Sequence, residues 1–338
     1  MRRLSIAALL ALAGCGAAPQ EAAAPPYLVY VTNEGSGDVS IIDPVKRVEI
    51  GRIAIGKRPR GLVASPDGKL LYVAVSGSPV AGPGVDESKL PPPDKAADGI
   101  VVIDLASRKI LRTLRGISDP EQIAISPDGT RLYVASEDTG QLIVIGSDGK
   151  LQAALNVGGE PEGVAVSPDG ATVLATSEED HSVAIVRGTP LAVTGRVAVG
   201  ERPRNALFLD DRHAVAPGEF DASLTLFDVA AAKPIRTIRL PKDDRPMGVV
   251  RIDADTVLVT TGRGKRLVRV DLDGKAQPVT GAVEVGPRAW GLALAPDGAL
   301  AFTANGPSND VTLVDARTMT VAGRVKVGTG PWGVLAVR

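Results

Sequence analysis

The stretch Gly56-Lys57-Arg58-Pro59-Arg60-Gly61 decides the fold, because relatives of it recur along the chain. The seven copies begin at Gly56, Gly116, Gly158, Gly200, Lys242, Gly286 and Gly328. The steps from 116 to 158, from 158 to 200 and from 286 to 328 are each 42 residues, and the step from 200 to 286 is two units of 43. A period of about 40–45 residues is typical of a β-propeller with one blade per unit. The sequence therefore predicts an all-β, seven-bladed propeller of four-stranded antiparallel blades.

Each unit contains four strand-like runs in the same order. A Ser-Pro-Asp-Gly turn at 65–68, 126–129 and 167–170, or Ala-Pro-Asp-Gly at 295–298, separates the first run from the second. Proline presets the turn and glycine adopts its positive φ. The chain begins with a second-strand segment at 27–32 and ends with a first-strand segment at 334–337. We expect these two segments to share a blade and close the ring, which removes exposed sheet edges.

Strand alternation places the recurring Gly-Pro loops and the loops between second and third strands on one face, which we call the top face. The longest irregular stretch, residues 76–98, falls in one of these loops and explains the step of 60 residues from Gly56 to Gly116. Its proline and glycine content excludes a regular element. A docking or lid role and a flexible insertion are both open for it.

Composition excludes several function classes for this chain of 338 residues. The formal net charge is −1, so bulk attraction to nucleic acid or acidic lipid is not expected. Cys15 is the only cysteine, which excludes disulfides, thiolate catalysis and a c-type haem motif. The aspartates that end third strands, such as Asp43 and Asp315, are expected to cap turns rather than to catalyse.

The N-terminus reads as an export signal. Arg2 and Arg3 precede an apolar run, 4–12, that is too short to span a bilayer permanently. The run ends in Leu12-Ala13-Gly14-Cys15, which resembles the lipobox of bacterial lipoproteins and implies acylation of Cys15; cleavage after Ala13 is the alternative. We expect a signal peptide over 1–14, an Ala/Pro tether over 15–26 and the propeller over 27–338. This predicts a periplasmic lipoprotein. Gly16, rather than Asp, follows the cysteine, which by resemblance to the enterobacterial sorting rule favours the outer membrane.

The segment Tyr30-Val31-Thr32-Asn33, followed by Val39 to Asp43, resembles the YVTN family of β-propeller repeats over 27–338. A narrower similarity, to the PQQ-dependent catabolism-associated β-propeller proteins, rests on RPRG (58–61), GGEPEGVAVSPDG (158–170), RAWGLALAPDG (288–298) and GPWGV (330–334). That resemblance implies an accessory role beside quinoprotein alcohol oxidation. The insertion 76–98 departs from the family's pattern and leaves room for another partner.

The recurring loops supply the candidate site, because a propeller collects one residue per blade at the mouth of its central channel. The candidate residues are Arg58, Arg60, Glu121, Glu160, Glu162, Arg202, Arg204, Arg245, Arg288, Trp290 and Trp332. Arginines could hold a carboxylate or phosphate, and the two tryptophans could form a stacking wall. Alternatively, Arg and Glu of neighbouring loops pair with one another and the tryptophans plug the channel.

Metal and catalytic motifs give weaker signals. Residues 177–181 (SEEDH), with Glu34, Glu137, Asp138 and Glu219 in matching loops, could bind a hard cation, although a solvated acidic loop is the simpler interpretation. His181 and His213 lie in no metal motif, and no metal or cofactor is assigned. Matches to dinucleotide and phosphate loops, at 328–333 and 51–57, lie in strand contexts and are rejected.

Three functions follow from these patterns. The first is a non-enzymatic, monomeric binding module whose top face takes a periplasmic protein, such as a quinoprotein dehydrogenase or cytochrome, or a small anionic ligand. In this case Arg204→Glu or Trp332→Ala should abolish binding without unfolding the ring. The second is implied by resemblance to seven-bladed propeller lactonases, which use acidic, His and Arg residues at the channel mouth; here these would be Glu162, Arg204, Arg58 and His181. The third is a structural protein of the cell envelope.

Overall fold

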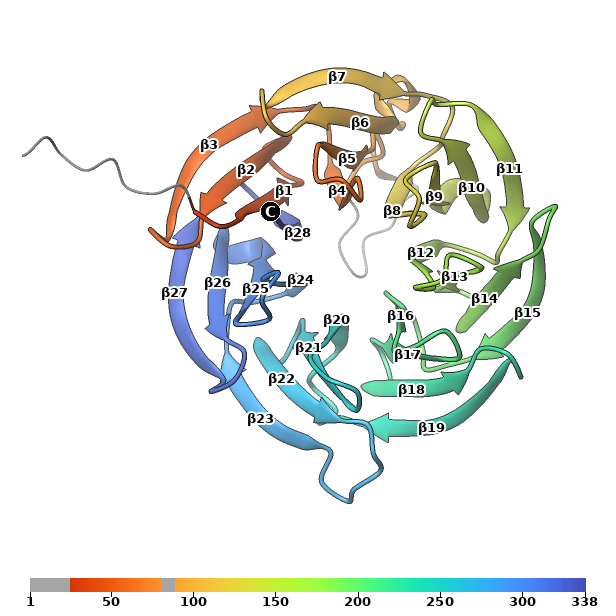
Figure 1. Cartoon of the computed structure of the whole chain (residues 1–338), viewed down its shortest axis with the longest axis vertical. Helices are drawn as coiled ribbons and strands as arrows, with labels where there is room; N and C mark the ends of the chain where they lie inside the picture. Colours follow the sequence, from red (N-terminus) through yellow and green to blue (C-terminus); the bar gives the residue numbers. More distant parts are fainter. Residues whose placement is uncertain (1–24, 81–88) are drawn as a thin grey trace, which may run out of the picture.

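The repeat folds as predicted, into seven four-stranded antiparallel sheets that radiate around a central axis (Figure 1). The computed structural model describes residues 25–80 and 89–338. The expected signal peptide, Cys15 and most of the tether lie outside the described residues, as does 81–88 of the insertion. Within the described part, no helical segment has the length and apolar character required to cross a bilayer.

The blades follow one another in chain order, and each has an innermost strand, two middle strands and an outermost strand. The first three consist of β28 (Pro331–Val337), β1 (Leu28–Asn33), β2 (Asp38–Asp43) and β3 (Val48–Ala54); β4 (Pro59–Ala64), β5 (Leu70–Val75), β6 (Gly99–Asp104) and β7 (Lys109–Leu114); and β8 (Pro120–Ile125), β9 (Arg131–Ser136), β10 (Gln141–Gly146) and β11 (Leu151–Asn156).

The other four consist of β12 (Pro161–Val166), β13 (Thr172–Ser177), β14 (Ser182–Arg187) and β15 (Ala192–Ala198); β16 (Leu207–Phe208), β17 (His213–Gly218), β18 (Ser223–Asp228) and β19 (Lys233–Arg239); β20 (Pro246–Arg251), β21 (Thr256–Thr261), β22 (Arg266–Asp271) and β23 (Val279–Glu284); and β24 (Ala289–Leu294), β25 (Leu300–Asn305), β26 (Asp310–Asp315) and β27 (Thr320–Lys326). Short 3-10 turns lie at Lys95–Ala97, Glu137–Thr139 and Gly306–Ser308.

Burial follows the position of each strand within its blade. The middle strands are covered on both faces, so β2 and β13 are buried along their whole length. The apolar runs 100–103 and 142–145 are buried in the same way, as predicted. Outer strands such as β3 alternate between exposed and half-buried residues because only one face packs against a neighbour. The core therefore lies between blades.

The ring closes as the sequence predicts. β28, from the C-terminus, pairs with β1 in the register Leu28↔Val337 and Tyr30↔Leu335.

Turns on the opposite face are capped by side chains. The Asp43 carboxylate accepts the backbone amides of Val45 (3.0 Å) and Lys46 (2.9 Å), which confirms a structural role for this aspartate.

The two sets of top-face loops are joined by a recurring backbone hydrogen bond. The residue after a second strand donates its amide to a carbonyl of the adjoining Gly-Pro loop: Glu137 to Asp119 (3.1 Å) and Glu178 to Glu160 (3.1 Å). Each accepting residue has a left-handed backbone, with φ of 41° at Asp119 and 44° at Glu160. The predicted shared face is thereby confirmed, and these bonds fix the loops that make them relative to their blades.

Candidate functional site

The left-handed position just described recurs in all seven top-face loops, where it falls on Arg58, Asp119, Glu160, Arg202, Arg245, Arg288 and Gly330. A positive φ is uncommon for residues other than glycine. In these loops it reverses the chain immediately before the first strand, so the loop turns into the channel mouth. The residue two positions later is the second residue of the first strand, except in the fifth blade, where Arg204 precedes β16. These two positions supply all of the predicted site residues.

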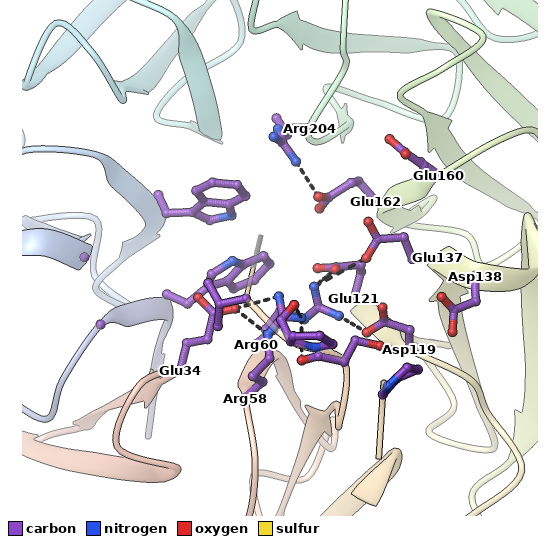
Figure 2. Close-up of a pocket in the computed structure, with 18 of the residues that line it drawn as sticks. Glu34, Arg58, Arg60, Asp119, Glu121, Glu137, Asp138, Glu160, Glu162 and Arg204 are labelled. Atoms are coloured by element: carbon purple, nitrogen blue, oxygen red, sulfur yellow. Dashed lines mark hydrogen bonds and ion pairs between the residues drawn. The ribbon is translucent and has the colours of Figure 1, made fainter. Parts of the chain in front are cut away.

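Arg60 forms the centre of one buried charge cluster (Figure 2). Its guanidinium pairs with Asp119 and Glu121, and it lies 3.5 Å from a carboxylate oxygen of Glu137. The Ser76 hydroxyl donates a hydrogen bond to Asp119. Although burial favours the neutral carboxyl, Arg60 lowers the pKa of Asp119. Burial, and next the Asp119 charge, raise the pKa of Glu137.

Arg204 forms the centre of a second cluster, which lies between the fourth blade (β12 to β15) and the fifth (β16 to β19). It pairs with Glu162 and Glu178, and its Nε donates to Glu219 at 2.7 Å. Arg202 also pairs with Glu178. Burial, and next the neighbouring Glu162 carboxylate, raise the pKa of Glu178 to about 9. Three carboxylates therefore share one buried guanidinium, and the cluster retains a proton near neutral pH.

The tryptophans form the aromatic wall of the mouth. The rings of Trp290 and Trp332 lie 5.4 Å apart between centroids and are tilted by 33°. Trp332 is only 6% exposed, whereas Trp290 is half-buried. Two guanidinium groups lie over the Trp290 ring, Arg204 at 4.7 Å and Arg288 at 5.0 Å from its centroid.

Arg288 differs from the other arginines of the mouth. Arg58 pairs with Glu34 at 2.9 Å, and Arg60, Arg202 and Arg204 have carboxylate partners as well. The side chain of Arg288 has no carboxylate partner within residues 25–80 and 89–338. Burial, and next the positive charge of Arg204, lower the pKa of Arg288.

These groups surround a cavity of about 1120 Å³ at the channel mouth. Its wall is acidic on the side of Asp119, Glu121 and Glu160, and aromatic and basic on the side of Trp290 and Arg288. The described parts of the insertion also line it, through Ser78, Pro79, Val80 and Leu90 to Pro93. Drug-sized ligands occupy cavities of roughly 300–1,000 Å³, so this one could hold a small molecule.

The structure brings most of the predicted residues together, but not all of them. Arg245 does not line the cavity; it lies 3.7 Å from Glu219 and stacks over Phe220 at 4.8 Å. His181 also lies outside, because its Nδ1 is held 2.7 Å from the Glu178 carbonyl oxygen. The predicted lactonase set therefore does not converge as a unit.

The alternative interpretation of the mouth, internal ion pairs with a tryptophan plug, is met in part, and a binding role for these residues stays a prediction. Arg60 and Arg204 pair with glutamates of neighbouring blades, and Trp332 is buried like a plug, yet an open cavity remains above them. The substitutions Arg204→Glu and Trp332→Ala are therefore unsuitable as probes of binding. The first would gather four carboxylates, and the second would remove a buried ring.

The sequence alone did not identify several of the acidic residues that pair with the arginines of the channel mouth. It did not place Asp119 among the candidate site residues, and it indicated Glu34, Glu137, Glu178 and Glu219 only as possible cation ligands. Their signal is positional: the four glutamates 34, 137, 178 and 219 all occupy the first place after a second strand. Aligning the units would have placed them beside the arginines.

Comparisons with known proteins extend the fold assignment. No family model matches the chain. Antigen Lp49 of Leptospira interrogans is 31% identical over 138 residues, covering 32% of this chain and 30% of that protein. The match therefore spans less than a third of the curated relative.

Solved structures match nearly the whole ring. A protein of unknown function from Desulfotomaculum acetoxidans has a TM-score of 0.75 at 16% identity, covering 92% of this chain and 99% of that one. The periplasmic gluconolactonase of Pseudomonas aeruginosa has 0.72 at 20%, with the same coverage. A protein from Bacteroides uniformis, named as a candidate 6-phosphogluconolactonase, has 0.73 at 15%, again covering 92% and 99%. At these identities the likeness shows the seven-bladed propeller fold and no more.

Proposed function

We propose that the protein is a binding module whose top-face cavity takes a small anionic ligand with a planar or sugar ring. The observation that carries this proposal is Arg288, a cavity-lining guanidinium without a carboxylate partner in the described residues, held 5.0 Å over the face of Trp290. A half-buried charge without a counterion is unfavourable, and an anion would compensate it. The exposed part of Trp290 offers a flat apolar surface next to that charge.

The ligand class follows from this pairing of groups. Carboxylates and phosphates bind guanidinium groups through two parallel hydrogen bonds. A sugar or aromatic ring attached to the anion would lie against the indole. The acidic wall of the cavity disfavours a second anionic group there and favours hydroxyl groups that can donate to Glu160 or Glu162. Sugar acids and compact aromatic carboxylates meet these requirements.

Intrinsic fluorescence provides the test, because Trp290 and Trp332 are the only tryptophans. Residues 27–338 would be titrated with gluconate, 6-phosphogluconate and PQQ as probes. We expect saturable quenching by at least one probe, weakened about 10–100-fold in Arg288→Gln, since a charged hydrogen bond contributes about 1.5–3 kcal/mol.

Arg245→Gln is the matched control, because Arg245 occupies the same left-handed position one blade earlier but does not line the cavity. It should bind like the parent. Failure of all three probes to change the fluorescence, or equal affinity in Arg288→Gln, would refute the site assignment.

The accessory role and the membrane anchor belong to this proposal as well. Only the resemblance to the PQQ-associated propellers supports a place beside quinoprotein alcohol oxidation, and it makes PQQ an informative probe. Acylation of Cys15 would hold the ring at a membrane in the periplasm. Replacing Cys15 with serine should then move the full-length chain from the membrane fraction to the soluble fraction of source cells, whereas an unchanged distribution argues against the anchor.

Lactone hydrolysis is the second candidate, and two observations favour it. The gluconolactonases named above share the fold. In this chain the Glu137 carboxylate lines the cavity 3.5 Å from Arg60, so a carboxylate that could activate water lies next to a cation that could polarise a carbonyl. Turnover of gluconolactone above the buffer rate, lost in Glu137→Gln and kept in Arg245→Gln, is the expected result. A rate equal to the buffer rate would reject this activity.

A further inference from the structure

We infer that Asp119, Glu121 and Glu137 form a binding site for a hard divalent cation, Ca²⁺ or Mg²⁺. One oxygen from each of these three carboxylates lies within 4.8 Å of the others. They come from adjoining elements of one blade, since Asp119 and Glu121 flank the start of β8 and Glu137 follows β9. Figure 2 shows all three converging on the Arg60 side of the cavity.

Glu121 points to a missing partner at this cluster. Its side chain is only 1% exposed, and its Oε2 atom is buried without any hydrogen-bond donor among the described residues. A carboxylate oxygen removed from water without a donor is costly, because the lost hydration is not replaced. Because one oxygen of Glu121 lies within 4.8 Å of oxygens of Asp119 and Glu137, one cation could satisfy all three groups.

Arg60 does not complete the site. The three carboxylates carry three formal negative charges, and Arg60 provides one positive charge among them. Each carboxylate has two oxygens, so pairing with Arg60 leaves Glu121 Oε2 available to a metal. A divalent cation would balance the remaining charge with Arg60 in place. Such compensation is required because buried unpaired charges are strongly unfavourable.

The surroundings also hold the ligands in position, as in established metal sites. The Ser76 hydroxyl donates to Asp119, and the Asp98 carboxylate accepts the Asp119 backbone amide at 3.0 Å. Asp98 is itself fixed by the Gly77 amide at 2.7 Å. The ligands are all oxygens and no histidine or cysteine is among them, which favours Ca²⁺ or Mg²⁺ over zinc. Water molecules from the cavity would fill the remaining positions.

The test of the cation site uses metal alone and does not require the organic ligand of the cavity. Full-length protein, or residues 27–338, would be treated with EDTA, dialysed, and titrated calorimetrically with CaCl₂ and with MgCl₂. We expect one saturable site for at least one of the two ions, together with a higher unfolding temperature at saturation. Glu121→Gln should weaken the affinity by about tenfold or more, since even indirect partners of metal sites contribute about 10–100-fold.

Glu179→Gln is the matched control, because Glu179 lines the same cavity but lies outside the three-carboxylate group. It should keep the parental affinity. Should Glu121→Gln fail to fold, Asp119→Asn takes its place with the same expectation. Absence of saturable binding by the parent up to about 1 mM of either ion, or equal affinity in the parent and Glu121→Gln, would overturn the inference.

Discussion

Glu178 illustrates how a single side chain can make the stability of this ring depend on pH. It is buried among Glu162, Arg202 and Arg204, and its pKa is raised to about 9, first by burial and then by Glu162. A carboxyl whose folded pKa exceeds its unfolded value binds a proton more tightly in the folded state. The stabilisation that this proton provides to the folded state is complete below the ordinary carboxyl pKa of 4.5. It is lost as the pH rises through the folded-state pKa of about 9.

The prediction at this scale concerns Glu178→Gln. The amide mimics the protonated acid, so the parent should lose stability relative to the variant as the pH rises from neutral to about 9. The slope of this difference is at most about 1.4 kcal/mol per pH unit. Urea unfolding at a series of pH values measures it, with exposed Glu179→Gln as the control. Parallel pH profiles for the parent and Glu178→Gln would show that Arg202 and Arg204 keep this carboxyl ionised.

At the scale of elements, a glycine at the third position of the first strand, present in five of the seven blades, allows adjacent blades to approach closely. A methyl group added at Gly291 would lie 2.4 Å from the carbonyl oxygen of Trp332 in the next blade, and one at Gly61 would lie 2.4 Å from that of Glu121. Backbone atoms cannot yield as a flexible side chain does. In these blades the spacing of innermost strands therefore depends on the absence of a side chain, which accounts for the final glycine of those repeats.

Gly291→Ala should therefore destabilise the protein by about 1–3 kcal/mol, the usual cost of overpacking. Gly306→Ala, in the same blade, is the control, because a methyl group there would meet nothing closer than 3.7 Å. Its effect should stay within about 0.5 kcal/mol. The urea midpoint, at unchanged m-value, measures both. A Gly291→Ala protein as stable as the control would mean that the first strands separate easily.

Sequence periodicity could predict the strands and the face on which the loops lie, because both repeat with the unit. It could not predict which charges pair. The partners of Arg60 and Arg204 lie on other loops and on adjoining blades, and long side chains choose among several carboxylates only after the ring has formed. The sequence also could not predict that Trp332 is buried while Trp290 is half-buried, because both residues occupy the same position in their repeats.

At the scale of the whole molecule, one strand from the C-terminus joins the two ends of the chain. β28 supplies the innermost strand of the first blade, and Trp332, Val334 and Val337 are buried there. Burying such side chains contributes about 1.5–3 kcal/mol each, so together they approach the whole stability of a typical domain, about 5–15 kcal/mol. Without β28, β1 would also expose an unpaired edge.

A chain ending at residue 330 should therefore lose its cooperative thermal transition and aggregate. The control is a chain ending at Val337, which lacks only the exposed Arg338 and should unfold like the parent. Circular dichroism on heating and light scattering measure these outcomes. A synthetic peptide of residues 331–338, added in excess, should restore the transition by pairing with β1, because binding to the folded state alone stabilises it. A chain ending at 330 that melts at the parental temperature would show that the remaining blades hold the ring without its closing strand.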